Sequence, residues 1–290
     1  MVVKEYDNAR LFLDDYEHVL LEQEAISQFV LYNAYQNLTT YDDRKVLFGA
    51  VFDEERPTLL FSNSLPYNMA IYLVQQEKVI AASTTLADYF VNNNIQFRGI
   101  NARHDVCWNF IEEYQKLTKD TFLERSRLDI MEIRKVNDIH PVEGKQRLAV
   151  LDEAKLIADW IIQFQIDSQV SEMDYEAALN RAKASIAENK IYVYEDVEEQ
   201  VVTMACTSRK LVHGMAITYV FTPQENRGKG FAAANMYYLC KELLESGHEF
   251  CTILVDKQNT LSERAYEKVG FHIVSDYFEY KLIKKEIEVV

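Results

Sequence analysis

The stretch V-F-T-P-Q-E-N-R-G-K-G-F-A, residues 220–232, determines how the rest of the chain is organised. An apolar run ends there at Pro223, which cannot continue a strand, and a helical pattern begins near Phe231. Between them, Gly228 and Gly230 allow backbone N–H groups to turn toward one point, and the N-terminus of the helix adds partial positive charge. The stretch therefore predicts a strand, a glycine loop and a helix start that together bind an anion such as a phosphate.

The composition indicates an acidic globular protein. Of the 290 residues, 48% are hydrophobic and 27% are charged, and the net charge is -15 with a pI of about 4.9. Because an acidic surface repels nucleic acid and anionic lipid, we expect neither as a partner. The same charge favours a cationic substrate such as an amine, although acidity also serves simply to keep a protein in solution.

The cysteines and the N-terminal residues indicate the cellular compartment in which the protein is expected. Cys107, Cys206, Cys240 and Cys251 show no C-x-x-C spacing, and three of them lie in apolar runs, where a thiol behaves as a small hydrophobic side chain. This pattern predicts no metal site and a reducing compartment. The start M-V-V-K-E-Y-D-N lacks an apolar signal segment, and no run approaches the roughly 20 apolar residues of a membrane span. We expect a soluble cytoplasmic protein.

The first half of the chain alternates helical and strand-like patterns. Helical spacing of apolar residues predicts one bent helix or two consecutive helices over residues 8–38. Later, a strand at residues 95–98 is expected to lead through the turn Gly99-Ile100-Asn101 into another helix. A connector follows at residues 136–145, which contains His140-Pro141. We therefore expect two domains, residues 1–140 and 145–290.

The second half has the order strand, two helices, three strands, glycine-loop helix, strand, helix and two strands. An almost wholly apolar run at residues 250–255 predicts a strand buried on both faces. The helix that follows is expected to end at Gly270. The three strands before the glycine loop are expected at residues 190–194, 200–207 and 215–221.

A second polar motif, D-K-Q-N-T-L-S-E-R-A-Y-E-K-V-G-F, occupies residues 256–271 after the buried strand. On a helix that begins near residue 259, the spacing i, i+3, i+7 places Asn259, Ser262 and Tyr266 on one face. A polar face at the end of a buried strand is typical of a site. For the individual residues, helix capping by Asn259 and an ordinary half-buried position for Tyr266 are the alternatives.

The two motifs, in this order, resemble those of the GNAT superfamily of N-acetyltransferases. Arg227, Gly230 and Ala232 match its acyl-CoA pyrophosphate loop, R/Q-x-x-G-x-G/A. The resemblance covers residues 146–283 and implies an α+β fold, with a mixed, mostly antiparallel central sheet flanked by helices. P-Y-N-M-A-I-Y at residues 66–72 and G-I-N-A at residues 99–102 resemble two-domain bacterial acetyltransferases, whose first domain is GNAT-like but degenerate and lacks the cofactor loop.

The resemblance implies that acetyl-CoA binds along the first motif. The strand end would contact the pantetheine mainly through backbone groups, where the two central strands splay beyond Phe221; the residues concerned are Val220, Phe221 and Thr222. The pyrophosphate would be held by the backbone amides of Gly228, Lys229, Gly230, Phe231 and Ala232. Arg227 and Lys229 would add positive charge, and Asn259 and Ser262 would contact the cofactor from the second motif.

The chemistry implied by the resemblance is direct attack of a primary amine on the thioester, with no covalent enzyme intermediate. A backbone N–H near Val220 would stabilise the oxyanion, and Tyr266, with an ordinary pKa of about 10, would donate its proton to the departing thiolate. Many family members carry a glutamate as general base where this chain has Ala216. His213, Glu195 or a water chain are the remaining options, so no base is assigned.

The leading hypothesis is thus an acetyl-CoA-dependent N-acetyltransferase for a small-molecule or peptide amine. A non-catalytic acyl-CoA-binding or sensor protein is the alternative, motivated by the missing glutamate and the degenerate first domain. A purely structural protein would require Gly228, Gly230 and Asn259 to be coincidental. The acceptor and the oligomeric state are left open by the sequence.

Overall fold

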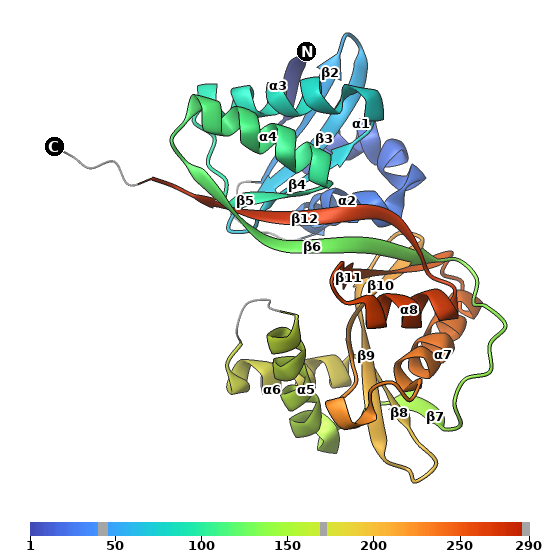
Figure 1. Ribbon diagram of the computed structural model, residues 1–290. Helices are drawn as coiled ribbons and strands as arrows, with labels where there is room; N and C mark the ends of the chain where they lie inside the picture. The colour runs from blue at the N-terminus through green and yellow to red at the C-terminus, as the bar shows by residue number, and fades with distance from the viewer. Residues whose placement is uncertain (40–45, 169–172, 286–290) are drawn as a thin grey trace. The chain divides into compact units, whose positions relative to one another are not determined.

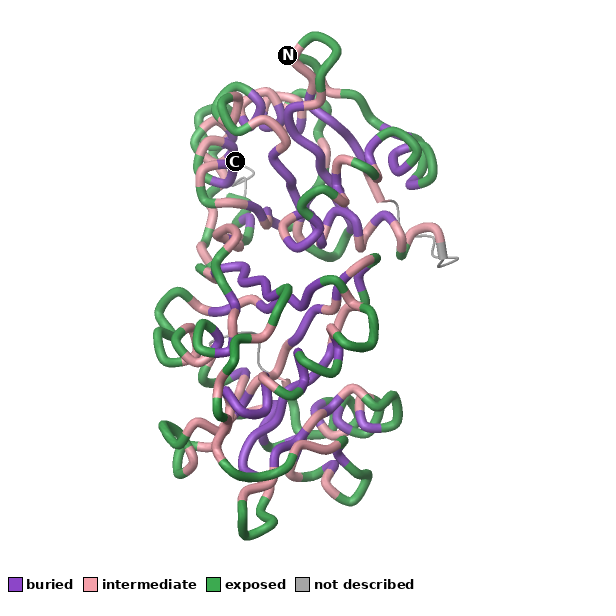
Figure 2. Tube along the Cα trace, turned by 90° about the vertical axis from the view of Figure 1, so that its right-hand side faces the viewer, coloured by how far each residue is buried: buried purple, intermediate pink, exposed green. Residues whose placement is uncertain are grey.

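The computed structural model of the protein describes residues 1–39, 46–168 and 173–285. It consists of two compact units, Met1–Leu128 with Ser275–Val290 and Asp129–Val274. Within each unit the buried residues, purple in Figure 2, are concentrated on the strands and on the helix faces that cover them. The connector expected at residues 136–145 lies inside the second unit, and the end of the chain belongs to the first.

The first unit is built on a sheet with the strand order β1-β2-β3-β4-β5-β12. Helices α1 and α2 cover one face and α3 and α4 cover the other (Figure 1). The elements of the first half are β1 (Val2–Tyr6), α1 (Ala9–Glu22), α2 (Glu24–Thr39), β2 (Val46–Asp53), β3 (Arg56–Ser64), β4 (Met69–Leu73), a 3-10 turn (Gln76–Lys78), α3 (Val79–Asn92), β5 (Gly99–Ala102), α4 (His104–Leu117) and β6 (Thr121–Ile133).

The prediction of a strand at residues 95–98 is wrong. The residues predicted to form the turn after it belong instead to strand β5. Ile95 donates its backbone N–H to the Phe90 carbonyl and so ends α3. The apolar character of this segment comes from Phe97, which is buried against the rings of Phe90 and Phe110. Strand β5 instead pairs with β4 on one side and with β12 on the other, and both partners are distant in sequence.

The second unit has the strand order β6-β11-β10-β9-β8-β7, and β10 and β11 are a parallel pair in an otherwise largely antiparallel sheet. Helices α5 and α6 cover one face, and α7 and α8 cover the other (Figure 1). Its elements are β7 (Lys145–Leu148), a 3-10 turn (Leu151–Glu153), α5 (Ala154–Asp167), α6 (Tyr175–Ala187), β8 (Ile191–Glu195), β9 (Val201–Lys210), β10 (Gly214–Phe221), a 3-10 turn (Gln224–Asn226), α7 (Phe231–Glu245), β11 (Phe250–Asp256), α8 (Thr260–Val269) and β12 (His272–Ile283).

The expected fold class is therefore confirmed: the protein has a mixed, mostly antiparallel sheet flanked by helices. The element order of the second half also agrees with the sequence, except that the two β-like stretches after Gly270 form one continuous strand, β12.

Both halves of the chain repeat one order of elements: strand, two helices, three strands, helix, strand, helix, strand. In each unit, the fourth and fifth strands of the repeat pair in parallel, β4 with β5 and β10 with β11. The last strand of each repeat, β6 or β12, has residues in both units. Beside β5 in the first unit lies β12, and beside β11 in the second lies β6, so each sheet uses a strand from the other half of the chain.

The cysteines, the possible metal ligands and the longest helices bear on the expectations from the sequence. All four cysteines are free and buried, and burial raises the pKa of Cys206 to about 11, which leaves its thiol protonated at neutral pH. In this part of the chain no three His, Cys, Asp or Glu side chains gather as a metal site would require. Across the same residues, no helix has the length and apolar character needed to cross a bilayer.

Candidate active site

The parallel strands β10 and β11 separate before either of them ends. Their pairing runs from Gly214 with Phe250 to Ile217 with Ile253, whereas β10 continues to Phe221 and β11 to Asp256. The two facing strand edges are therefore open from Thr218 onward. The splay expected beyond Phe221 begins earlier, within β10 itself.

A bulge in β10 explains why the strands part. Opposite β9, Thr218 pairs with Cys206 and Phe221 with Met204, so two residues of β10, Tyr219 and Val220, face one residue of β9. Such a bulge bends the strand that carries the extra residue. Tyr219 has φ +49, in the left-handed region that residues with a side chain seldom adopt. The bend lies where the open edges begin.

The end of β10 after the bulge is bonded to β9. The Phe221 carbonyl accepts a hydrogen bond of 2.7 Å from Thr203 Oγ1 on β9. Val220 lies within the bulge, where the regular alternation of N–H and C=O directions is interrupted, on the strand whose edge is open toward β11. Of the strand-end residues expected to contact pantetheine, Val220 thus lies at the open edge, while the Phe221 carbonyl is bonded to β9.

The glycine loop ends in a helix N-terminus that no side chain caps. Gly228 has φ +76 and Gly230, the N-cap of α7, has φ +90, both in the region that favours glycine. The first intrahelical hydrogen bond of α7 joins the Ala234 N–H to the Gly230 carbonyl at 3.0 Å. The N–H groups of Phe231 and Ala232 in the first turn thus have no partner within the helix. This end of α7 is suited to an anion.

The two basic side chains of the loop, Arg227 and Lys229, are bonded to protein groups. Arg227 donates from Nε to the Thr222 carbonyl at 2.9 Å and from a terminal guanidinium nitrogen to Asp167 Oδ2 at 2.6 Å. Lys229 donates to Asn226 Oδ1 at 3.1 Å. The Arg227 guanidinium is therefore directed toward α5. The sequence, by contrast, predicts that it adds positive charge at the pyrophosphate.

The polar face of α8 is formed as its spacing predicts. Asn259 caps the helix, because its Oδ1 accepts the Ser262 N–H at 3.1 Å, and this is the structural role considered as the alternative. Ser262 also forms a hydrogen bond with Tyr266. Tyr266 is only 4% exposed and lies in the core beneath α7 and α8. Burial raises the pKa of Tyr266 above its ordinary value, and the Ser262 hydrogen bond opposes that shift only in part.

None of the base candidates from the sequence is placed to accept a proton at the open edges. Ala216 is buried in β10, and Glu195 accepts a hydrogen bond of 2.7 Å from Arg147, with which it is ion-paired. His213 precedes β10 at its far end, roughly 16 Å from Thr218, where the open edges begin, at roughly 3.3 Å per strand residue. We assign no general base.

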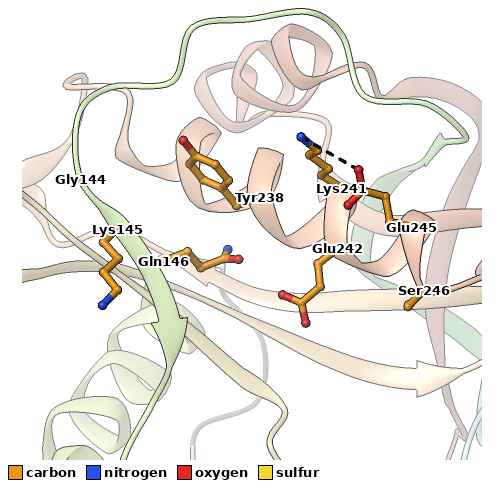
Figure 3. Close-up of a pocket in the computed structure, with 8 residues that line it drawn as sticks. All are labelled: Gly144, Lys145, Gln146, Tyr238, Lys241, Glu242, Glu245 and Ser246. Atoms are coloured by element: carbon orange, nitrogen blue, oxygen red, sulfur yellow. Dashed lines mark ion pairs between the residues drawn. The ribbon is translucent and has the colours of Figure 1, made fainter.

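A cavity of about 710 Å³ lies elsewhere in this unit, between β7 and the C-terminal half of α7 (Figure 3). In Figure 3 the Glu242 carboxylate points away from the Lys241–Glu245 ion pair, so the charged groups do not converge on one point. The anion-binding features are at the other end of α7. We therefore do not include this groove in the candidate site.

A family model decides the relationship of this unit. The model of the Acetyltransferase (GNAT) family matches residues 155–271. This segment is a GNAT domain. The match begins in α5 and ends after α8, so the GNAT domain contains the open edges of β10 and β11, the glycine loop and the polar face of α8.

Solved structures extend the similarity in fold beyond the GNAT domain. A GNAT-family acetyltransferase from Colwellia psychrerythraea has a TM-score of 0.53 at 11% identity, covering 98% of this chain and 100% of that one. A Drosophila protein has a TM-score of 0.57 at 12% identity, and the alignment covers 97% of this chain and 98% of that one. A GCN5-related N-acetyltransferase from Sphaerobacter thermophilus has a TM-score of 0.54 at 13% identity, and the alignment covers 88% of this chain and 87% of that one. At these identities the likeness concerns the fold. No match was found among curated proteins.

Two residues of the site were not singled out from the sequence. Thr203 is fully buried on β9 and bonds both the Phe221 carbonyl and, at 2.8 Å, the Thr222 hydroxyl. Asp167 ends α5 and holds Arg227. In sequence, Thr203 is an ordinary β-branched strand residue and Asp167 an ordinary polar residue, so no local signal distinguishes them.

Proposed function

We propose that the chain is an acetyl-CoA-dependent N-acetyltransferase that acts on a primary amine. The observation that carries the proposal is the continuity of the site: the open edges of β10 and β11 lead to a glycine loop and to the uncapped N-terminus of α7. An extended chain can add to an open strand edge as a further strand, and a phosphate can bind at a helix N-terminus. Pantetheine joined to a diphosphate has this combination of shapes.

Different groups of the chain would bind the cofactor and stabilise the charge that develops in such a reaction. The Val220 backbone at the open edge would align the pantetheine and stabilise the negative charge on the thioester oxygen, and the first-turn amides of α7 would hold the diphosphate. Acetyl-CoA supplies the activated acetyl group. The amine nitrogen forms the new C–N bond and loses a proton to water, while the C–S bond breaks and the thiol leaves with a proton.

Tyr266 suits the donation of that proton to the leaving thiolate. Burial raises the pKa of Tyr266, so the phenol keeps its proton at neutral pH and can donate a hydrogen bond to the thiolate, but it is a weaker acid than an ordinary tyrosine. Asn259 and Ser262 support this role from the same helix face, since Asn259 fixes the start of α8 and Ser262 bonds Tyr266.

The acceptor we propose is a small-molecule or peptide amine in the cytoplasm. The net charge of -15 favours the approach of a cation over that of an anion. A non-catalytic acyl-CoA-binding protein is the second candidate, and the observation that favours it is Ala216, where a catalytic carboxylate would stand.

Calorimetry with the full-length chain and acetyl-CoA tests the proposal directly. We expect saturable binding and a rise in the unfolding temperature, since ligand at about 100 times its Kd stabilises the folded state by about 2.7 kcal/mol. Release of free thiol with an amine panel would then establish transfer. No heat and no thermal stabilisation would overturn the proposal, and binding without thiol release for any amine would favour the non-catalytic alternative.

We expect Gly228→Ala to weaken acetyl-CoA binding by about ten-fold or more. An added Cβ would meet no protein atom within 4 Å, so the cost arises from φ +76, about 1–2 kcal/mol for a residue with a side chain. The loop relieves that strain by turning its amides away from the anion. Titration calorimetry of the purified variant measures the change in affinity.

Gly247→Ala is the matched control for that substitution. Gly247 follows the C-terminal end of α7, has φ +107 and is also open around its Cβ, so a similar strain arises far from the loop. Both variants should unfold at a lower temperature, but the control should keep its affinity for acetyl-CoA. Equal losses of affinity would show that general destabilisation, and not loop geometry, is responsible.

A further inference from the structure

Arg227 of the glycine loop makes three contacts with two other parts of the GNAT domain. Its Nε donates to the Thr222 carbonyl at 2.9 Å, and its guanidinium carbon lies 5.7 Å from the centre of the Phe221 ring, so two contacts are with the end of β10 and its continuation. The third is the ion pair of 2.6 Å with Asp167 at the end of α5.

The three residues that contact Arg227 make further contacts of their own. Asp167 accepts a second hydrogen bond of 2.8 Å, from Gln163 one turn earlier in α5. The Phe221 ring packs against Trp160 of α5 at 5.8 Å, and Thr222 is fixed through its hydroxyl by Thr203 of β9. Arg227 therefore closes a connection from β9 and β10, through the start of the loop, to α5.

Three directional contacts suit the planar guanidinium, which presents several N–H donors in fixed directions and stacks on aromatic rings. A lysine ammonium at this position could pair with Asp167 but could not also bond Thr222 and lie flat on Phe221. The other basic side chain of the loop, Lys229, forms its hydrogen bond with Asn226, so among the described residues it differs from Arg227 in having no hydrogen-bond or ion-pair partner outside the loop.

We propose that Arg227 is a positioning residue: it clamps the glycine loop to α5 through Asp167 and so presents the amides of residues 228–232, and it does not act as a charge on the cofactor's diphosphate. The inference rests on the proposed function and specifies how the binding loop is held. Without the clamp, the loop must be ordered at the moment of binding, and this ordering lowers affinity.

The two possible roles of Arg227 predict opposite signs for Asp167→Asn. If Arg227 is a clamp, removing the Asp167 charge loosens the loop, and acetyl-CoA binds more weakly by about two- to five-fold, the range of an exposed ion pair. If Arg227 is a phosphate ligand, the same substitution frees the guanidinium and removes a negative charge near the anion, so binding becomes tighter. Titration calorimetry of the full-length protein distinguishes the two results.

Substitution of Arg227 itself provides an independent measurement. As a clamp, Arg227→Lys and Arg227→Gln should weaken acetyl-CoA binding to a similar extent, because lysine keeps the charge but loses the geometry. Full rescue of affinity by Arg227→Lys would overturn the proposal. In a double-mutant cycle, Asp167→Asn should have no further effect once Arg227 is glutamine, whereas additive effects would contradict a shared clamp.

Thermal unfolding and the wild-type titration separate the possible failures. A variant whose unfolding midpoint falls far below that of wild type is not interpreted from its affinity, and the Asp167→Asn result then decides. If wild-type protein does not bind acetyl-CoA, the proposed function fails. If wild type binds and Asp167→Asn binds more tightly, the proposed function stands and the clamp is overturned.

Discussion

We expect that a fragment of residues 145–290 does not fold into a stable GNAT domain, although the composition of the connector makes it the obvious fragment to express. It lacks residues 129–133 of β6, which lie beside β11 in the sheet of the second unit. It also lacks Asn137, whose backbone N–H bonds the Val269 carbonyl at 2.8 Å at the end of α8.

The size of the loss follows from the side chains that the fragment omits. Met131 and Ile133 are fully buried in the core that also contains Tyr266, and the buried Asp129 carboxylate forms an ion pair with the exposed Lys257. Loss of a buried methionine or isoleucine side chain costs about 2–5 kcal/mol, so these two together account for about 4–10 kcal/mol. Domain stabilities are about 5–15 kcal/mol, so little stability remains.

Far-UV circular dichroism during heating measures this outcome. We expect no cooperative transition for residues 145–290, and a cooperative transition for residues 129–290, which restores the missing strand segment and the bonds of Asn137. An equally cooperative transition at the same temperature in both fragments would contradict the expected role of residues 129–144.

Tyr266→Phe is expected to lower the turnover of acetyl-CoA by about 100-fold or more, the contribution typical of a general acid, while changing the affinity for acetyl-CoA by less than about two-fold. The phenol is buried and its pKa is raised, so it carries a proton at neutral pH, and phenylalanine fills the same space without the proton. Initial rates of thiol release at saturating acetyl-CoA, together with calorimetric affinities, measure the two quantities separately.

Ser262→Ala is the control for the Tyr266 hydroxyl. It removes the hydrogen bond to Tyr266 but leaves the proton donor in place, so turnover should fall much less than in Tyr266→Phe. Because burial places the pKa of Tyr266 above its ordinary value of about 10, its deprotonation should cause no loss of turnover up to about pH 10. Equal losses of turnover and affinity in Tyr266→Phe would indicate a binding role.

Features that depend on short stretches of chain could be predicted from the sequence. The glycines of the loop and Gly270 after α8 have positive φ values, a requirement that is visible in the residue type. The limits of α8, Thr260–Val269, agree with the prediction, because its Asn259 cap and the glycine at its end are both local signals. The common face of Asn259, Ser262 and Tyr266 follows from helical geometry.

Features that depend on distant partners could not be predicted. The sequence predicts a turn where β5 lies, because the four residues of this strand, Gly99–Ala102, carry no strand pattern and gain their hydrogen bonds from β4 and β12. The sequence also does not predict where the Arg227 guanidinium points, since its partner Asp167 lies in α5, far away in the chain. The bulge at Tyr219 that opens the strand edges depends on the register of β10 against β9.

The sequence by itself determined the order of the elements in the second half, its GNAT resemblance and the glycine loop before α7, because periodicity, turn chemistry and helix caps act over a few residues. Tertiary structure alone decided which strand completes each sheet, where β10 and β11 part and how Arg227 is held. These depend on pairing between segments far apart in the chain, and the free energy of such pairing comes from surfaces that no short stretch of sequence contains.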